Sequence, residues 1–412
     1  GMWSILYLMC NTRKKIMNRD LMDFSKPAVL IANHSSVLDL QRIISLYPKI
    51  LLLTNKWVWR SPVFGPLVRM ADYYPVEEGA EFSIEKMKYW VDRGYSIAVF
   101  PEGTRSYDSE MKRFHKGAFY IAEKLNLDIQ PLVFQGIGYS MSKGDFLLKD
   151  GEINCKFMPR IKNTDTQYGL TYSERAKSIG KYFRSEYDNF RKERETVHYF
   201  KEQLIRNYIY KGPILEWYCR IKIKLEGYYE TIEKHVPKKG HILDIGCGYG
   251  YLDYILSWTS KERQIKGVDY DEEKISVATH NFSINDHLSF EAIDALSLTE
   301  NNKYDCILLM DVLHYLVPEK QQLLLNKISS LLSDGGVFIL RDGITEMSKK
   351  ITGTKLSEYF STTLFKFNKT ENELHFISLE MIKIFAKENQ FDLEIIDDTK
   401  FTSNILIVMR KK

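Results

Sequence analysis

The chain has 412 residues and a formal net charge of +4, with 44% hydrophobic and 27% charged residues. This length and balance predict two or three globular domains and exclude extended disorder. The charge excess is too small to indicate nucleic-acid binding, and no apolar run approaches the roughly 20 residues that span a bilayer. The five cysteines are scattered without paired spacing, so we expect reduced thiols, no metal site and a cytoplasmic protein.

The chain begins with an apolar and aromatic run, residues 3–10 (WSILYLMC), and residues 13–19 then carry four Lys or Arg. Such a segment suits an anionic membrane surface, but it equally suits a first helix that faces the core. Gly1 before Met2 resembles a remnant of expression. We expect a protein peripheral to the inner face of the cytoplasmic membrane, or the soluble C-terminal part of a larger membrane protein.

A histidine follows the apolar run at residues 28–32. Residues 28–32 (AVLIA) predict a buried strand that leads through residues 33–39 (NHSSVLD) into a helix. Five helical steps separate two side chains by roughly 140°, so His34 is expected before the helix and Asp39 in its first turn. Asp39 then fixes one imidazole nitrogen and leaves the other to take a proton. The alternative is that Asp39 only satisfies the helix's first amides.

A second polar turn follows another buried strand. Residues 96–100 (SIAVF) predict the strand, and residues 101–106 (PEGTRS) predict a sharp turn. A carboxylate between proline and Gly103, with Arg105 two residues later, makes a loop suited to a polar head group. An ordinary surface turn in which Arg105 pairs with Glu102 is the alternative.

Together the two stretches resemble the motif pair of the glycerolipid acyltransferases, which include lysophosphatidate acyltransferases, over roughly residues 20–165. The resemblance implies an α/β domain in which His34, oriented by Asp39, deprotonates the acceptor while Glu102 and Arg105 position it. It implies an acyl thioester of coenzyme A or of an acyl carrier protein as the donor. Further substrate contacts are implied for four residues: Lys56, Arg69, Gly103 and Thr104.

One position departs from that family. After residues 75–77 the family usually carries an arginine that helps to hold the acceptor's phosphate, and this chain has Glu78. A carboxylate there repels a phosphomonoester unless Lys56, Arg69 or Arg105 compensates, so the acceptor need not be lysophosphatidate.

The domain boundaries follow from changes in composition. Residues 50–54 and 129–134 predict further strands of a first domain, residues 1–168. Residues 169–224 are charged and helical and are expected to form a solvated linker. The aromatic helical stretch 216–235 is expected to supply lid or entry helices for the domain that follows, residues 225–412.

The second domain opens with a glycine-rich turn. Residues 241–245 (HILDI) predict a strand, and residues 246–250 (GCGYG) precede a helix at 251–257. Glycines let the backbone turn tightly and approach a ligand beside the helix N-terminus. Dinucleotide enzymes favour G-x-G-x-x-G, whose last glycine falls on Tyr251 here, so the spacing disfavours an NAD-dependent domain.

The spacing G-x-G-x-G with an acid two residues upstream resembles class I S-adenosylmethionine-dependent methyltransferases, over about residues 225–412. Strands alternating with helices predict a Rossmann-like, doubly wound, mostly parallel sheet. The resemblance implies S-adenosylmethionine as cofactor, with Asp269 on the ribose hydroxyls and Asp294 near the adenine amino group. The cofactor-binding residues that we expect are Asp244, Gly246, Gly248, Gly250, Asp269, Asp294 and Asp311.

Near the end of the strand at 304–310, His314 is a candidate base for the methyl acceptor, and a structural histidine under the cofactor is the alternative. Arg341 and Asp342 either reach the acceptor pocket or form an ion pair at a strand end. Residues 346–376 are an aromatic insertion that caps a hydrophobic substrate or covers the sheet edge.

The leading hypothesis is a bifunctional lipid-modifying enzyme that acylates a lysolipid-like acceptor and methylates a lipid or an aryl-polyene-type intermediate. This arrangement resembles the C-terminal part of bacterial proteins that join a lipid exporter, an acyltransferase and a methyltransferase. The expected partners are a lipid acceptor, a membrane surface and an acyl carrier protein, without nucleic acid. The competing hypothesis is a methyltransferase whose first domain only binds lipid or membrane.

Overall fold

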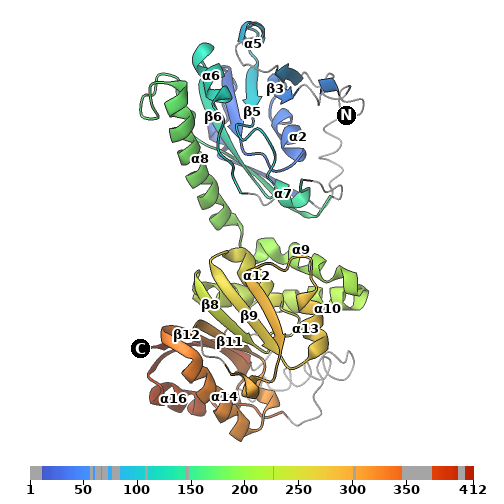
Figure 1. Ribbon diagram of the computed structural model, residues 1–412, viewed down its shortest axis with the longest axis vertical. Helices are drawn as coiled ribbons and strands as arrows, with labels where there is room; N and C mark the ends of the chain where they lie inside the picture. Colours follow the sequence, from blue (N-terminus) through green and yellow to red (C-terminus); the bar gives the residue numbers. More distant parts are fainter. Residues whose placement is uncertain are drawn as a thin grey trace. The chain divides into compact units, whose positions relative to one another are not determined.

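The structure, a computed structural model, describes residues 12–55, 59–60, 66, 73–76, 84–106, 110–143, 148–225, 227–299, 303–345, 374–397 and 404–412. The chain divides into two compact units, Gly1–Arg194 and Glu195–Lys412. Each unit is built on a seven-stranded sheet with helices packed against it (Figure 1). The two α/β units agree with the fold class that the sequence predicts.

The sheet of the first unit has β2 (Ala28–Ala32) near its centre, between two parallel neighbours. Every residue of β2 is buried, because helices or loops cover both faces of an apolar strand of this kind. The strands, in sheet order, are β1 (Thr12–Met17), β7 (Gly151–Phe157), β6 (Asp128–Gln135), β2, β5 (Ser96–Val99), β3 (Ile50–Asn55) and β4 (Tyr73–Val76). The helices are η1 (Arg19–Leu21), α2 (Leu38–Ile44), α5 (Ile84–Val91), α6 (Gly117–Lys124), α7 (Ile137–Ser140) and α8 (Tyr172–Arg194). The strands predicted at 28–32, 50–54, 96–100 and 129–134 are confirmed to within a residue or two.

The long helix α8 differs from the predicted solvated linker. It packs against α6 and β6 of the first unit (Figure 1). Its buried apolar residues recur every three or four positions: Ala176, Ile179, Phe183, Tyr187 and Phe190. This stripe completes the first unit's core, so the expected linker 169–224 is divided between the two units at residue 194.

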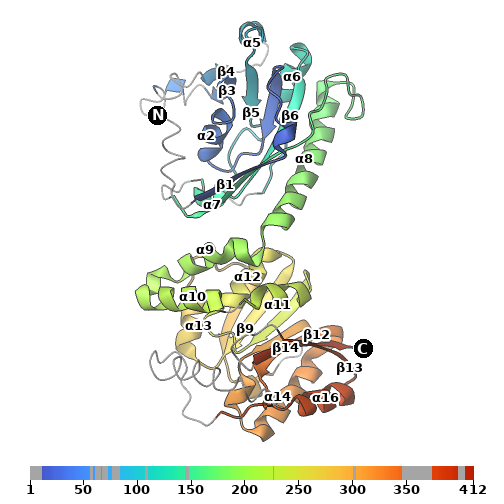
Figure 2. The same ribbon diagram turned by 180° about the vertical axis from the view of Figure 1, so that it is seen from behind.

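The remaining helices of the expected linker belong to the second unit, where α9 packs against α10 and α12. Side chains of both helices, including Leu204, Ile205, Leu215 and Cys219, are buried in that unit's core. These helices are α9 (Val197–Asn207), η3 (Ile209–Lys211), α10 (Pro213–Leu225) and α11 (Tyr229–His235). Figure 2 shows them on one face of the second sheet.

In the second sheet the first five strands are parallel, and only β14 runs antiparallel to its neighbours. The strands, in sheet order, are β10 (Leu288–Ala292), β9 (Arg263–Asp269), β8 (Gly240–Ile245), β11 (Tyr304–Met310), β12 (Leu332–Gly343), β14 (Asn404–Lys411) and β13 (Phe391–Ile396). The helices after α11 are α12 (Tyr251–Thr259), α13 (Glu272–Thr279), η4 (Ala295–Ser297), η5 (Leu313–Tyr315), α14 (Pro318–Leu331) and α16 (Leu379–Glu388). The strand order reverses between β8 and β11, which places a ligand crevice at their carboxyl ends.

Among the described residues, no helix combines the length and the apolar character that crossing a bilayer requires.

Candidate functional site

The first candidate site lies where β2 ends and α2 begins. Asn33 anchors this turn to β6, because its amide donates to the carbonyl of Phe134 and accepts from the Phe134 N–H at 2.9 and 2.8 Å. His34 follows, with Nδ1 3.0 Å from Oδ2 of Asp39. The Asp39 side chain is fully buried, and 15% of the His34 side chain is exposed. No hydrogen bond to His34 Nε2 is formed within the described part of the chain, so this nitrogen can receive a proton.

Asp39 also holds the turn that precedes α2, rather than the first amides of the helix itself. The same Oδ2 that faces the imidazole accepts the backbone N–H groups of Ser35 and Ser36 at 2.7 and 2.8 Å. Three donors thus hold one carboxylate oxygen in place. As a carboxylate, Asp39 accepts a hydrogen bond from an Nδ1–H group, and the histidine tautomer that carries this hydrogen has its lone pair on Nε2.

Glu102 links the two loops of this site. Its Oε1 accepts the His34 N–H at 2.7 Å, and its Oε2 accepts the Lys112 N–H at 2.8 Å. Burial raises the pKa of this carboxyl, while the two amide hydrogen bonds oppose the rise. Both oxygens of the buried carboxylate are engaged by backbone amides, so Glu102 ties the second loop to His34, and its role toward an acceptor stays a prediction.

Two further contacts fix the imidazole beside that loop. Phe100, which ends the strand segment before Glu102, stacks on His34 with ring centroids 4.1 Å apart and planes 19° apart. The Ser106 N–H donates to the carbonyl of His34 at 3.0 Å. The second loop therefore folds against the histidine, and Arg105 is one residue from this contact.

Two lysines that the sequence reasoning missed converge on the same loop. Lys112 donates from Nζ to Thr104 Oγ1 at 2.9 Å and to the carbonyl of Arg105 at 3.3 Å. Lys143 donates from Nζ to the same carbonyl at 3.3 Å. The two ammonium groups thus share one acceptor oxygen, and both lie next to Thr104 and Arg105. The sequence gives no signal for this, because 31 positions separate the two lysines.

Several expected features lie outside the described residues. Lys56, Arg69 and Glu78 are among them, as are the segment 3–10 and most of the insertion at 346–376. Of the four predicted substrate contacts in the first unit, Gly103 and Thr104 are described. Gly103 adopts a left-handed φ of +70°, and a side chain there would crowd the ring of His115.

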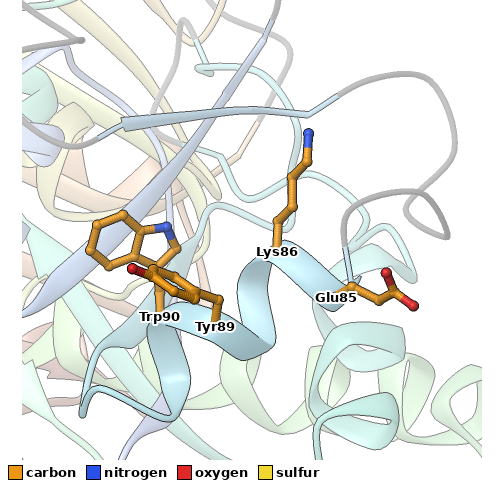
Figure 3. Close-up of a pocket in the computed structure, with 4 residues that line it drawn as sticks. All are labelled: Glu85, Lys86, Tyr89 and Trp90. Carbon is orange, nitrogen blue, oxygen red and sulfur yellow. The ribbon is translucent and has the colours of Figure 1, made fainter.

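A shallow open depression lies on α5, apart from these loops. Glu85, Lys86, Tyr89 and Trp90 line it (Figure 3). The two rings meet edge to face at 5.4 Å, and Arg93 stacks on the Tyr89 ring at 3.3 Å. Neither His34, Asp39 nor Glu102 lines it.

The second candidate site is the glycine-rich turn after β8. Gly246, Gly248 and Gly250 all have left-handed φ values, between +57° and +76°. A side chain at Gly246 would collide with Val312, and one at Gly250 with Phe290. Gly248 instead faces open space. The turn therefore needs glycine and presents bare backbone at its middle residue.

Carboxyl groups end three neighbouring strands beside this turn. Asp269, the last residue of β9, accepts the Gly248 N–H through Oδ2 and the Asp271 N–H through Oδ1, both at 2.9 Å. Asp294, after β10, is exposed and accepts the Leu296 N–H at 2.8 Å. Asp244, within β8, is buried. Each oxygen of Asp269 keeps one lone pair, so a hydroxyl donor can still be accepted there.

The carboxylate of Asp311 already has protein partners, which the sequence does not predict. It has a left-handed φ of +56°, and its carboxylate forms an ion pair with Arg341. Asn404 donates to its other oxygen at 2.8 Å. Arg341 also lies over the ring of Tyr228 at 3.9 Å. The expected pair of Arg341 with Asp342 is not the one formed: Arg341 instead engages Asp311, the carboxylate that was expected to bind the cofactor, and Asp342 pairs with His314.

His314 forms a second histidine–aspartate pair, with Nδ1 2.7 Å from Oδ1 of Asp342. Asp342 also accepts the N–H groups of Leu313 and Gly343 at 2.8 and 2.7 Å. The His314 side chain is fully buried, and its ring contacts Tyr315 at 4.2 Å. The contacts favour a histidine that ties the segment after β11 to the end of β12.

The glycine-rich turn fits the cofactor that the sequence resemblance implies. Open space at Gly248 admits a ligand against bare backbone, and acidic groups at adjacent strand ends suit hydroxyl and amine donors. Oδ1 of Asp244 is buried and meets no donor within the described residues, which suits a cationic or protonated ligand nearby.

Comparison with known proteins gives separate matches for the two units. The sequence profile of the acyltransferase family matches residues 11–135, and that of a methyltransferase domain matches residues 237–377. The chloroplastic 1-acyl-sn-glycerol-3-phosphate acyltransferase BAT2 of Brassica napus is 31% identical over 132 residues. That alignment covers 31% of this chain, and the chain spans 38% of the length of that relative.

Two solved structures are similar to parts of the chain. The 1-acyl-sn-glycerophosphate acyltransferase of Thermotoga maritima is 18% identical with a TM-score of 0.40, and the match covers 46% of this chain and 79% of that one. An S-adenosylmethionine-dependent methyltransferase of Clostridium acetobutylicum is 18% identical with a TM-score of 0.35. That match covers 48% of this chain and 99% of that one.

The chain is therefore a two-domain protein that joins two transferase folds. Residues 11–135 belong to an acyltransferase domain that is similar to 1-acyl-sn-glycerol-3-phosphate acyltransferases, and residues 237–377 belong to a methyltransferase domain.

Proposed function

We propose that the N-terminal domain transfers an acyl group from a thioester to a hydroxyl or amine of a lysolipid-like acceptor. The observation that carries this proposal is the His34 imidazole, held through Nδ1 by buried Asp39 and partly exposed at the end of β2. An oriented base with an accessible nitrogen suits proton abstraction and has no use in a domain that only binds lipid. A thioester of coenzyme A or of an acyl carrier protein is the proposed donor.

The proposed reaction balances with this one base. His34 Nε2 removes the acceptor's proton while the acceptor oxygen or nitrogen attacks the thioester carbonyl. The carbon–sulfur bond then breaks, and the imidazolium returns the proton to the leaving thiolate. Asp39 stabilises the imidazolium between these two events. General-base help of this kind accelerates such reactions by about 10²- to 10⁴-fold.

We propose an anionic head group for the acceptor. Lys112 and Lys143 share the Arg105 carbonyl beside the histidine loop, so two ammonium groups lie at one backbone oxygen. Such a cluster favours a phosphate or another anion. Glu78 opposes a phosphomonoester in the family's usual place, so we assign the head group to the side of the site where Lys112 and Lys143 lie.

Acceptor-dependent release of thiol from an acyl thioester tests this proposal. We expect release with lysophosphatidate or another anionic lysolipid, and slower release with a neutral lysolipid of the same chain length. If no acceptor leads to consumption of the thioester, the result would instead favour the competing hypothesis, in which the N-terminal domain only binds lipid or membrane.

For the C-terminal domain we propose S-adenosylmethionine-dependent methylation of a lipid or an aryl-polyene-type intermediate. Asp244, Gly246, Gly248, Gly250, Asp269 and Asp294 are the residues proposed to hold the cofactor. When bound, this cofactor supplies an activated methyl group on a sulfonium. The chain's own part is to orient the acceptor against it and to exclude water.

Within that domain we propose a positioning role for His314, because its ring is buried and tied to Asp342.

Calorimetric titration with S-adenosylmethionine and with NAD tests the cofactor assignment. We expect binding of the first and none of the second, and a Gly248→Val variant should lose it because its side chain fills the open backbone position. Binding of NAD alone would contradict the assignment.

We further propose that the protein works at a membrane surface, since its proposed acceptor is a lipid. Exposed Tyr89 and Lys86 on α5 are side chains suited to the interface of an anionic bilayer. Flotation with anionic vesicles tests this proposal, with Tyr89→Ser and Lys86→Ser as variants. Equal recovery of the protein with and without vesicles would contradict it.

A further inference from the structure

A pair of buried carboxyl groups lies beneath the glycine-rich turn. Asp244 belongs to β8 and is 3% exposed, and Asp253 belongs to the first turns of α12 and is fully buried. Within the described residues no donor reaches Oδ1 of Asp244 or either oxygen of Asp253. The two side chains lie close enough to form a hydrogen bond with each other once one of them carries a proton.

Two ionised carboxylates cannot share such a place without cost. Each loses its hydration, and their charges repel in a medium that screens poorly. One proton between them removes the repulsion and the desolvation cost of one charge, and the carboxylic acid that results donates a hydrogen bond to the remaining carboxylate. Burial raises the pKa of both groups, and the charge of Asp244 raises the pKa of Asp253 further.

Among the described residues, Asp244 is the charged group that acts on Asp253, so no cation there serves as its counter-charge. Asp269 from β9 adds negative charge beside Asp244, and Lys222 from α10 is the cation that acts on Asp244. The other titratable groups that face the pair are neutral in their ordinary state: Cys247, Cys306, Tyr208 and Tyr254. A proton is therefore the simplest partner for Asp253.

We propose that Asp253 is a positioning residue that holds one proton and donates it to Asp244, and that cofactor binding is coupled to the loss of this proton. The pair then has a charge of −1 in the free protein. When a ligand with net positive charge enters the glycine-rich turn, the O–H bond of Asp253 breaks, the proton goes to solvent and the pair reaches −2. The coupling rests on the function proposed for the C-terminal domain, whereas the shared proton in the free protein does not.

Infrared spectroscopy of the full-length free protein tests the shared proton. We expect the carbonyl stretch of a protonated carboxylic acid at neutral pH, and its loss in Asp253→Asn, which donates a hydrogen bond but has no acid proton. Asp286→Asn, at an exposed carboxylate of the same unit, is the control and should keep the band. Absence of the band from the wild-type protein would overturn the proposal whether or not the cofactor binds.

Calorimetry tests the coupling. Titration with S-adenosylmethionine in buffers of different ionisation enthalpy should show proton release for wild type and none for Asp253→Asn. The wild-type affinity should rise with pH, by at most about tenfold per pH unit for one proton, and that of Asp253→Asn should be less dependent on pH. Binding of S-adenosylhomocysteine, which lacks the sulfonium charge, should release fewer protons.

Equal proton release by wild type and Asp253→Asn would overturn the coupling. If Asp253→Asn does not fold, Asp253→Ser replaces it, because a hydroxyl also donates without titrating in this range. If S-adenosylmethionine does not bind at all, the proposed methyltransferase function fails, and the infrared band still decides whether the proton is shared.

Discussion

The two histidine–aspartate pairs of this chain are built alike. In each, one carboxylate accepts an imidazole Nδ1 and two backbone N–H groups, from Ser35 and Ser36 in one domain and from Leu313 and Gly343 in the other. In each, an aromatic ring packs against the imidazole at just over 4 Å. Local geometry alone therefore does not separate a base from a structural histidine.

The solvent exposure of the imidazole distinguishes the two histidines. The His34 side chain is 15% exposed at the end of β2, and that of His314 is 0% exposed. A general base must reach the proton that it removes, directly or through one water. We therefore assign chemistry to the first pair and positioning to the second, and the two pairs should respond differently to the same change.

The largest expected effect is on acyl transfer by His34→Ala. This variant removes the proposed base and should lower kcat by about 10²- to 10⁴-fold. Binding of S-adenosylmethionine, measured by calorimetry on the same preparation, should be unchanged and controls for folding. Acyl transfer at the wild-type rate would remove His34 from the chemistry.

The matching change, His314→Ala, should act on stability. It leaves the buried carboxylate of Asp342 without its ring partner, and such a loss costs about 1–3 kcal/mol. Denaturant unfolding followed by circular dichroism measures this, and acyl transfer should be retained. If His314→Ala is as stable as wild type but has lost methyl transfer, His314 is a base after all.

A smaller effect is expected where the acceptor's head group binds. Replacing both Lys112 and Lys143 by Ala should raise KM for an anionic lysolipid by about 10- to 150-fold, because a hydrogen bond to a charged group contributes about 1.5–3 kcal/mol. The exposed lysine of the same region, Lys116→Ala, is the matched control. If the ratio of the KM for a neutral acceptor to the KM for an anionic acceptor is unchanged in the double variant, the two lysines do not select the head group.

The smallest effect is expected for Phe100→Leu, which keeps the apolar contact with His34 but removes the stacked ring. Aromatic pairs add about 0.5–1.5 kcal/mol beyond their buried area, so acyl transfer should fall only severalfold. Steady-state kinetics across pH measures this. A loss as large as that of His34→Ala would mean that the ring does more than orient the imidazole.

Much of the fold could be predicted from the sequence, because buried parallel strands are read from short apolar runs. The strands ending near Ala32 and Ile245, the turn at Gly246 and the helical position of Asp39 follow from local pattern alone. Helix α8 was misread because charged residues dominate its sequence. Its core contacts depend on a stripe of side chains at every third or fourth position, including Ile179.

The parts of the sites that could not be predicted depend on contacts between distant segments. Glu102 meets the His34 N–H across 68 positions, because β2 and β5 are parallel neighbours. Lys143 reaches Arg105 across 38 positions. Asp253 looks like any acid on an amphipathic helix until its burial against Asp244 is known. The sequence pattern locates the strand ends, but the tertiary fold determines which distant side chains contact them.

Chemical labelling of the imidazoles tests the distinction between the two pairs most directly. Native protein is treated with diethyl pyrocarbonate, modified histidines are located by peptide mass mapping, and acyl transfer is followed in parallel. We predict modification of His34, loss of acyl transfer in proportion to it, protection by the acyl thioester, and no modification of His314. Modification of His314 before His34, or full acyl transfer by protein labelled at His34, would contradict the assignment.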